Sequence, residues 1–401
     1  MTQPPLTIGL FWHSMNSDNL GIGALTVSNV EILRRVAAGR GRAVRFLLLT
    51  WRDPRPWYFE APDIEDHAFR RRALLRPGGP VGAAIARCDL IVDIGAGDSF
   101  TDIYGRQRFT DLWVSKLRTR LAGVPLVLAP QTIGPFEGAG ARMLARRAIG
   151  WTRLAATRDA PSSRALEALA PGASALEATD VAMGLPYDPP APRAPGGPVR
   201  VGVNVSGLLF NGGYTGANQF GLKADYPALI RALLGWFHAR PEVELHLVGH
   251  VQSRQNATED DHRVGEALAA EFPGARVAPF FGAPSEAKSY IAGMDFFTGA
   301  RMHATVAAFS SGVPVIPMAY SRKFAGLFGT LGYDHVADCR TEDADEIVAK
   351  IVRGYEDRAA LARDVARGRA QVEARLARYA EALGAVLDEI APRADASAGT
   401  A

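Results

Sequence analysis

The chain has 401 residues, which is long for one domain and natural for two. Hydrophobic residues make up 48% and charged residues 22%, a composition typical of a globular protein rather than a disordered or fibrous one. The formal net charge of +3 is too small to indicate a nucleic-acid-binding protein, whereas it is compatible with a basic pocket for an acidic metabolite.

The first half of the chain alternates apolar strands with loops and helices. After a strand at residues 6–12, a glycine-containing loop at 16–23 leads into a helix at 24–38. Further strands are predicted at residues 44–50, 88–94, 125–129 and 154–157, followed by loops at 95–98, 130–134 and 158–159. Uninterrupted apolar strands that alternate with helices indicate a parallel sheet with helices on both faces.

A segment rich in proline and glycine, residues 187–198, then interrupts the pattern and is the best linker candidate in the chain. The alternation restarts with strands at 199–205, 243–248, 276–278, 294–298 and 313–318 and helices at 224–239, 261–271 and 285–292. More helices are predicted between residues 344 and 390. We therefore predict two α/β domains with parallel sheets, residues 1–190 and 199–401. Because ligands bind at the carboxyl ends of such strands, we expect a site in a cleft between the domains.

The isolated cysteines, Cys88 and Cys339, predict neither a zinc site nor a redox motif, and a reducing cytoplasm is the simplest expectation. The N-terminus does not read as a signal peptide, and no window approaches an apolar membrane span. Short basic clusters at residues 70–72 and 146–147 are expected on solvated helix faces, the alternative being attraction to anionic lipid or a lipid-linked substrate. We expect a cytoplasmic protein, acting in solution or at the inner face of the membrane.

The residues after the strand at 294–298 carry the most specific chemical signal. Gly299 ends the strand, Arg301 and His303 stand where a helix should begin, and Gly312 closes that helix. Helix N-termini bind anions, arginine matches planar carboxylates and phosphates, and histidine exchanges protons near neutral pH. We predict a site for a phosphorylated or carboxylated ligand. The alternative is a structural arginine and a histidine packed at the helix start.

Two strand ends of the first domain carry further candidates. Arg158 is a candidate anion contact from across the cleft; alternatively it folds back on Asp159, which has the position of a helix N-cap. The glycine-rich loop after the third strand allows close approach of a ligand to the backbone, although it is not a dinucleotide fingerprint. Asp98 or Asp102 is a candidate base for a sugar hydroxyl, the alternative being N-cap and turn roles.

Three more loops supply binding candidates. The loop at 16–23 is expected to contact an acceptor through its backbone, with Asn19 as a binding residue, or to form a plain turn. His250 ends a strand of the second domain and is expected to contact substrate; a metal site formed with residues 260–262 is the weaker alternative. Lys323 is expected to add positive charge beside Arg301, or else to be solvated.

Taken in order, these motifs resemble those of the polysaccharide pyruvyltransferases. The likeness runs from about residue 16 to 323 and rests on Arg301-Met302-His303 with 312–314 and 320–323, Gly95-Ala96-Gly97 with Asp102, residues 130–135, and Arg158-Asp159 with Ser162. Met302 stands where the family often has leucine.

Members of that family transfer the pyruvyl group of phosphoenolpyruvate to sugar hydroxyls as a ketal, on a fold like that of the GT-B glycosyltransferases. The resemblance implies two Rossmann-like domains, with the acceptor on the N-terminal side and phosphoenolpyruvate on the C-terminal side. It implies that phosphoenolpyruvate is held by Arg158, Arg301, His303 and the backbone of Met302. Gly97 and Gln131, from the loops that carry the likeness, are counted among the substrate-binding residues.

The chemistry of this reaction agrees with the residues. Phosphoenolpyruvate carries a carboxylate and a phosphate, which suit arginines and a helix N-terminus. His303 is the candidate acid that protonates C3, and Asp102 or Asp98 the candidate base. Arginines and a lysine would stabilise the leaving phosphate: Arg301, Arg158 and Lys323.

The expected partners are phosphoenolpyruvate and a sugar, lipid-linked oligosaccharide or polysaccharide acceptor, with no cofactor, metal or nucleic acid. The acceptor sugar and the oligomeric state stay open. Because fold alone does not fix function, two alternatives remain: a GT-B glycosyltransferase that uses a nucleotide sugar, and a non-catalytic carbohydrate-binding member of an assembly complex.

Overall fold

The computed structural model describes residues 4–95, 99–193 and 196–392 of the chain. The chain folds into two compact units. The first consists of Met1–Asn16, Leu25–Val181 and Ala374–Ala401, and the second of Ser17–Ala24 and Ala182–Glu373. The sequence pattern predicts one continuous domain on each side of residues 187–198, whereas here an early segment belongs to the second unit and the C-terminal segment to the first.

A parallel sheet forms the centre of the first unit. Its strands lie in the order β3-β2-β1-β4-β6-β7-β8, with β5 paired to β6, and each of these pairings is parallel. The central strands β1, β4 and β6 are buried along their whole length, which explains their uninterrupted apolar sequences. The bounds of the strands are β1 Leu6–Phe11, β2 Val44–Leu49, β3 Ile64–Asp66, β4 Leu90–Asp93, β5 Ser99–Phe100, β6 Leu126–Ile133, β7 Thr152–Thr157 and β8 Ala175–Glu177.

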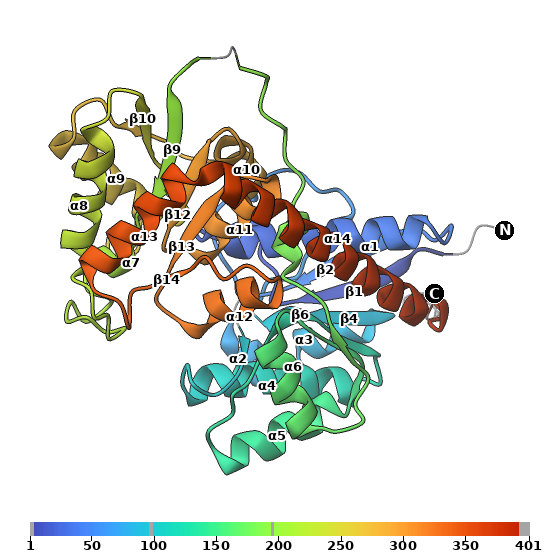
Figure 1. Cartoon of the computed structure of the whole chain (residues 1–401). Helices are drawn as coiled ribbons and strands as arrows, with labels where there is room; N and C mark the ends of the chain where they lie inside the picture. The colour runs from blue at the N-terminus through green and yellow to red at the C-terminus, as the bar shows by residue number, and fades with distance from the viewer. Residues whose placement is uncertain (1–3, 96–98, 194–195, 393–401) are drawn as a thin grey trace. The chain divides into compact units, whose positions relative to one another are not determined.

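Helices cover both faces of this sheet. Figure 1 shows α3, α4, α5 and α6 on one side of β4 and β6, and α1 on the other. The hydroxyl of Tyr379, on α14, donates to Asn29 Oδ1 on α1 at 3.1 Å, which joins the later part of α14 to this unit. The bounds are α1 Leu20–Ala38, α2 Arg71–Leu75, α3 Pro80–Ala86, α4 Arg106–Leu121, α5 Ala139–Ile149, α6 Ala160–Leu169 and α14 Arg358–Asp388.

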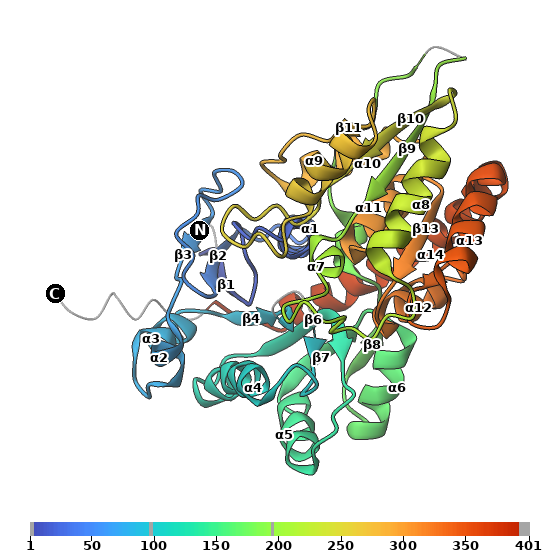
Figure 2. The same cartoon turned by 90° about the vertical axis from the view of Figure 1, so that its left-hand side faces the viewer.

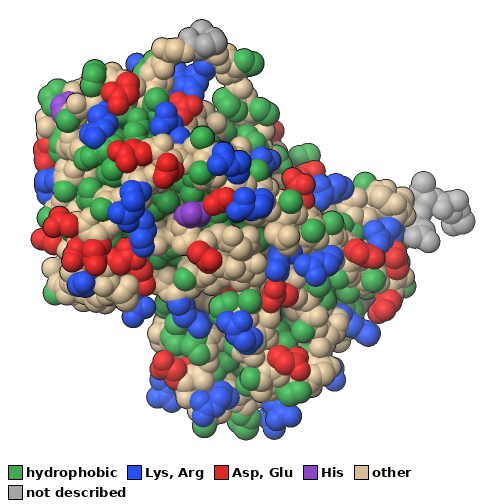
Figure 3. Space-filling model, in the orientation of Figure 1, with side chains coloured by type: hydrophobic (Ala, Val, Ile, Leu, Met, Phe, Trp, Pro, Cys, Tyr) green, Lys and Arg blue, Asp and Glu red, His purple; other side chains and the backbone are tan. Residues whose placement is uncertain are grey.

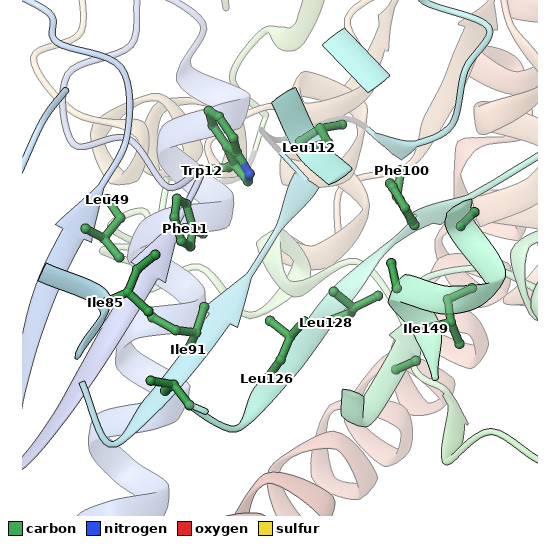
Figure 4. Close-up of a cluster of buried hydrophobic side chains, with 14 of the residues drawn as sticks. Phe11, Trp12, Leu49, Ile85, Ile91, Phe100, Leu112, Leu126, Leu128 and Ile149 are labelled. Atoms are coloured by element: carbon green, nitrogen blue, oxygen red, sulfur yellow. The ribbon is translucent and has the colours of Figure 1, made fainter. Parts of the chain in front are cut away.

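A hydrophobic cluster fills the space between the sheet and helices α3 to α5. Figure 4 shows side chains from the strands, among them Ile91, Leu126 and Leu128, facing Ile85, Leu112 and Ile149 of the helices. Burial of each such side chain contributes roughly 1.5–3 kcal/mol. Phe11 and Trp12 belong to the same cluster and lie at the carboxyl end of β1, so the core reaches the edge of the sheet where ligands bind.

The second unit has a parallel sheet of its own, in the order β11-β10-β9-β12-β13-β14. In Figure 2, α8 and α13 lie on one side of β9 and β10 and α10 lies on the other. Its strands are β9 Val199–Asn204, β10 Val243–Leu247, β11 Arg276–Val277, β12 Phe296–Gly299, β13 Val315–Ala319 and β14 Ala337–Asp338. Its helices are α7 Gly207–Phe210, α8 Tyr226–His238, α9 Asp261–Glu271, α10 Pro284–Ala292, α11 Met302–Ser311, α12 Arg322–Thr330 and α13 Ala344–Glu356. The prediction of two parallel sheets with helices is confirmed.

The chain between the two sheets is attached to α10 of the second unit. Lys288 Nζ, buried on α10, donates to the carbonyls of Met183 and Leu185 at 3.1 and 2.9 Å. The Asp188 N–H donates to Ser289 Oγ at 2.9 Å. The start of the predicted linker is therefore hydrogen-bonded to this unit.

The surface agrees with the small net charge of the chain. Figure 3 shows Lys and Arg side chains interspersed with Asp and Glu side chains over the face that it draws. Among the described residues, no helix combines the length and the apolar character needed to cross a membrane.

Candidate active site

At the centre of the second unit's sheet, two neighbouring strands are followed by connections that run in opposite directions. β9 and β12 are neighbours, but the chain leaves β9 towards β10 and leaves β12 towards β13, on opposite sides. In parallel sheets, such a reversal opens a crevice at the carboxyl ends of the two strands, where ligands bind. Asn204 ends β9 and Arg301 follows β12 at this point.

The helix after β12 begins where the sequence predicts. Arg301 is the N-cap of α11, and its backbone N–H donates to Asn204 Oδ1 at 2.8 Å. Gly299 allows this approach, because a Cβ there would lie 2.6 Å from the Asn204 Cβ. Gly312 ends the helix with a φ of 92°, a left-handed conformation that favours glycine. The predicted helix between Arg301 and Gly312 is confirmed.

A buried carboxylate organises this edge of the sheet. Asp261, the first residue of α9, accepts from Arg301 Nε and Nη2 at 3.1 and 2.9 Å. Its two oxygens also accept the backbone N–H groups of Gly207 and His250, at 2.8 and 3.1 Å, and Asn204 Nδ2 at 3.2 Å. One side chain therefore joins the segments that follow β9, β10 and β12.

The protein uses only part of the Arg301 guanidinium. Nη2 also donates to the Glu259 carbonyl at 2.8 Å, whereas Nη1 has no hydrogen-bond partner within the described ranges. Burial lowers the pKa of Arg301, but the Asp261 carboxylate, with smaller contributions from Tyr320 and Glu259, holds this pKa above its ordinary value. Arg301 is thus a fixed cation with one nitrogen left for an anionic ligand.

His303 lies against the start of a second helix. It is the second residue of α11, and Gly21 is the second residue of α1. A Cβ at Gly21 would lie 2.3 Å from His303 Nδ1, so only glycine fits there. Helix N-termini carry N–H groups without intrahelical partners and a partial positive charge. Two such termini therefore flank this imidazole, and Met302 begins one of them.

The segment that contains Gly21 is held by the end of β10. The Leu20 N–H donates to the His250 carbonyl at 3.1 Å, and Asn19 forms an isolated antiparallel bridge with Val251. Asn19 Oδ1 accepts the Gly21 N–H at 3.0 Å. Asn19 and His250 are thus neighbours, and the Asn19 side chain caps the first turn of α1.

His250 is buried and uncharged. Burial, together with the nearby His303 and Arg301, lowers the pKa of its imidazole to about 3. At neutral pH the ring is therefore a neutral hydrogen-bonding group. Asp261 contacts the backbone of His250, and the part of the chain that the structure describes holds no group of three or more His, Cys, Asp or Glu residues placed to bind a metal ion.

Lys323 and two acidic groups complete the surroundings. Lys323 lies in the first turn of α12, after β13, the strand next to β12. Burial lowers its pKa to about 7, so it is divided between the charged and neutral forms near neutral pH and is not the permanent cation that the sequence suggests. Burial raises the pKa of both Glu259 and Tyr320, which favours their protonated forms beside Arg301.

In the first unit, Arg158 is fully buried at the end of β7. Its Nη1 donates to Asp180 Oδ2 at 3.0 Å, whereas Nε and Nη2 are buried with no partner among the described residues. Buried donors are rarely left unused, so these nitrogens are suited to an anionic ligand. Asp159 accepts the Ser162 N–H at 2.8 Å and caps α6, which confirms the N-cap alternative for that residue. Whether Arg158 and Arg301 bind the same molecule stays a prediction.

The acceptor-side candidates have structural partners of their own. The two oxygens of Asp102 accept the N–H groups of Glu137 and Gly138, both at 2.9 Å, so this carboxylate holds a loop in addition to any role as a base. Gln131 is buried, and its Nε2 donates to the Asp93 carbonyl at 2.9 Å, which leaves Oε1 as its unused atom. Gly97 and Asp98 lie outside the described residues.

Sequence reasoning missed Asn204 and underrated Asp261. Asn204 follows three apolar or small residues, Val201 to Val203, at a strand end, and a polar residue at such a position is a signal for a site. The sequence offers Asp261 only as part of a weak metal-site alternative, because the distance in sequence between residues 261 and 301 conceals their ion pair.

Comparisons with known proteins give the family. A family model described as polysaccharide pyruvyl transferase matches residues 25–322, which is most of the chain. No curated protein matches the sequence.

Solved structures give the fold. Sucrose-phosphate synthase from Thermosynechococcus elongatus is similar with a TM-score of 0.55 and 14% identity, covering 96% of this chain and 98% of that one. The glycosyltransferase SnogD from Streptomyces nogalater gives 0.52 and 18%, covering 96% and 99%. A UDP-forming trehalose-phosphate synthase from Burkholderia vietnamiensis gives 0.52 and 13%, covering 100% and 99%. At such identities the likeness shows the fold alone, which is that of the GT-B glycosyltransferases.

The Asp261 ion pair predicts a large loss of stability in Asp261→Ala. The substitution leaves Arg301 charged and buried, so we expect the free energy of unfolding to fall by about 3–5 kcal/mol in urea denaturation. Asp260→Ala is the matched control: it removes only the cap of α9, through the bonds to His262 and Arg263, and should cost about 1 kcal/mol. Equal losses in the two variants would contradict the central role of Asp261.

The buried His250 predicts a loss of stability in acid. Its pKa is about 3 in the folded chain against about 6.5 unfolded, so between these values the unfolded state binds the extra proton and stability falls as pH falls. We expect His250→Asn to flatten the decline by up to about 1.4 kcal/mol per pH unit, measured by urea denaturation from pH 7 to 4.5. His238→Asn, at an exposed imidazole, is the control. A decline of unchanged slope in His250→Asn would show that this ring is not buried in the neutral form.

Proposed function

The chain belongs to the polysaccharide pyruvyl transferase family, and on that basis we propose that it transfers the pyruvyl group of phosphoenolpyruvate to two hydroxyls of a sugar. The product is a ketal on a saccharide, and inorganic phosphate is released. The acceptor is a sugar, a lipid-linked oligosaccharide or a polysaccharide precursor in cell-surface polysaccharide biosynthesis.

The observation that carries the proposal is the arrangement around Arg301. Nη1 of Arg301 faces no protein partner in the described chain, while Asp261 fixes the guanidinium on its other side. The N-termini of α1 and α11 flank His303 in the same unit. Phosphoenolpyruvate offers anionic oxygens for the guanidinium and the helix termini, and a carbon that must receive a proton.

The proposed reaction assigns the protons as follows. His303 gives a proton to C3 of phosphoenolpyruvate, which becomes a methyl group and leaves a cationic centre at C2. The oxygen of one sugar hydroxyl bonds to C2, and a base takes its proton. The bond from C2 to the phosphate oxygen breaks, phosphate leaves, and the second hydroxyl oxygen bonds to C2 with loss of its own proton. Arg301 would stabilise the charge on the departing phosphate.

Arg158 and Lys323 have supporting roles in this proposal. The unused Nε and Nη2 of Arg158 would bind an anionic group of the donor, as the family resemblance implies. Lys323, with a pKa of about 7, would donate a hydrogen bond or a proton to the phosphate. Asp102 remains the described candidate for the base that activates the sugar, because a carboxylate oxygen that accepts one backbone N–H still has a lone pair to offer.

A nucleotide-sugar glycosyltransferase is the alternative with the same fold. The solved structures favour it only as a fold, because their identity to this chain is low, whereas the family match favours pyruvyl transfer. The two functions differ in the donor that must bind, and a direct test is therefore available.

The first functional prediction concerns the donor. We expect phosphoenolpyruvate, but not UDP-glucose or GDP-mannose, to raise the melting temperature of the wild-type protein. Arg301→Ala would expose Asp261 as an unpaired buried charge, so Arg301→Lys is the better variant: it keeps a cation and removes Nη1. We expect it to bind phosphoenolpyruvate weaker by roughly 1.5–3 kcal/mol. Arg263→Lys, at an exposed arginine on α9, is the control. A rise in melting temperature with a nucleotide sugar, and none with phosphoenolpyruvate, would contradict the proposal.

The second functional prediction concerns the proton. His303→Gln should keep most of the phosphoenolpyruvate-dependent rise in melting temperature, but should release phosphate about 10²–10⁴ times more slowly with a saccharide acceptor. In heavy water, the wild-type product should carry one deuterium in its ketal methyl group, because C3 takes its third hydrogen from solvent through the enzyme. His238→Gln should behave like wild type. Undiminished phosphate release in His303→Gln would remove His303 as the acid.

A further inference from the structure

The first unit has a cavity at its own reversal of strand order. β1 and β4 are neighbours, and the chain leaves them towards opposite ends of the sheet, towards β2 and β6 respectively. A cavity of about 430 Å³ opens there, within the range of small-ligand sites. Its lining comes from the segments after the carboxyl ends of β1, β2 and β5: Trp12, Trp51, Tyr104, Arg108 and Asp111 among others.

Two walls of the cavity are aromatic and exposed. Trp51 and Tyr104 are 37% and 43% exposed, although large aromatic side chains usually avoid water. Trp51 is fixed from behind, with its ring 4.8 Å from Trp12 and 5.3 Å from Phe69, both members of the hydrophobic core. Trp51 is therefore a rigid platform with one side open.

Trp12, which packs behind Trp51, has an unfavourable backbone conformation. Its φ is 65°, in the left-handed region that non-glycine residues rarely adopt. Its ring is nevertheless buried and donates through Nε1 to Ser115 Oγ at 3.0 Å. Such strain persists where the surrounding structure demands it and is concentrated at functional sites.

Polar groups complete the cavity. Arg71 Nε contacts both oxygens of Asp111 at 2.9 Å, and the Arg108 guanidinium lies 5.9 Å from the centre of the Tyr104 ring. Arg108 Nη2 donates to the Gly95 carbonyl at 3.2 Å. Arg71 and Asp111 form an ion pair and Arg108 is a second cation, so hydrogen-bond donors and an acceptor both lie beside the aromatic rings.

A second cavity, of about 730 Å³, adjoins the first. Trp51 and Arg71 line both, so the two form one groove with Trp51 at the junction. The second cavity adds Asp53, Asp66 and Arg52 to the groove. Carboxylates and guanidinium groups recur along its length.

We propose that this groove binds the saccharide acceptor as an extended chain of at least two sugar rings, one stacked on Trp51. The proposal rests on the proposed function and deepens it, because it assigns an oligosaccharide rather than a monosaccharide or a nucleotide sugar as the acceptor.

The chemistry of the groove distinguishes these ligands. Sugar rings have apolar faces that pack on aromatic rings and hydroxyls that both donate and accept hydrogen bonds, which paired arginines and carboxylates can satisfy. A nucleoside diphosphate favours a site with unpaired cations, whereas here Arg71 is already paired with Asp111 and the other arginines are interspersed with carboxylates. A monosaccharide would fill only one of the two adjoining cavities.

The test compares binding of saccharides of increasing length to the whole protein. The probes are a library of mono-, di- and tetrasaccharides of glucose, galactose, mannose, N-acetylglucosamine and glucuronate, with UDP as the competitor, and the readout is tryptophan fluorescence supported by calorimetry. We expect at least one series to bind tighter with length. Trp51→Ala and Tyr104→Ala should weaken that binding about tenfold, in line with the loss of an aromatic anchor. Phe59→Ala removes an equally exposed aromatic that does not line the groove, and should bind as wild type does.

Each other result overturns the proposal. These are no binding by any saccharide, equal affinity for mono- and tetrasaccharides, displacement by UDP, or equal weakening by Trp51→Ala and Phe59→Ala. The rise in melting temperature with phosphoenolpyruvate is measured on the same variants and should persist in Trp51→Ala. If saccharide binds and phosphoenolpyruvate does not, the proposed function fails while the saccharide groove stands; the reverse result removes only the groove.

Discussion

The second unit depends on one buried ion pair, between Asp261 and Arg301. A carboxylate buried without a partner would cost several kcal/mol, and so would a buried guanidinium, so neither residue can be placed here without the other. Asp261 also accepts the backbone N–H groups of Gly207 and His250. The same negative charge therefore fixes the geometry of three strand ends and keeps Arg301 in its cationic form. The residues at the sheet edge therefore fix the position of Arg301. Its guanidinium is already oriented before a ligand binds.

The topology explains why polar residues gather at these edges. In each sheet two central strands are followed by connections that lead in opposite directions, β1 and β4 in one and β9 and β12 in the other. The loops diverge there and leave the carboxyl ends of the strands uncovered. In one sheet the uncovered edge holds Arg301 and His303, and in the other it holds an aromatic groove around Trp51. The same folding pattern thus supports an anion site and a groove suited to hydroxyl-rich ligands, because the loops carry the chemistry and the sheet only positions them.

Local sequence signals predicted those features of the site that depend only on residues close together in the chain. The strand ending at Gly299, the helix start at Arg301 and the left-handed Gly312 follow from propensity, and all three are present. The partner of Arg301 could not be predicted in this way, because Asp261 lies forty residues earlier and meets it only when β9, β10 and β12 assemble. The exchange of residues 17–24 into the second unit was missed for the same reason, since its cause is a bridge between Asn19 and Val251. The charge of Lys323 was misjudged because burial, which a single sequence does not reveal, lowers its pKa.

Arg301 and Arg158 share a feature that bears on how the proposed reaction could turn over. Each is buried and commits part of its guanidinium to an aspartate, Arg301 to Asp261 and Arg158 to Asp180. Arg301 retains one nitrogen atom and Arg158 two without a protein partner in the described chain. The ion pair removes most of the rotational freedom of the side chain before a ligand arrives, so less entropy is lost on binding. It also compensates part of the positive charge. An uncompensated arginine would bind free phosphate strongly, and phosphate is the product that the proposed reaction releases. A partly neutralised arginine instead favours a ligand that also contacts the neighbouring helix termini. A donor with two anionic groups can make both contacts at once, whereas free phosphate has only one anionic group.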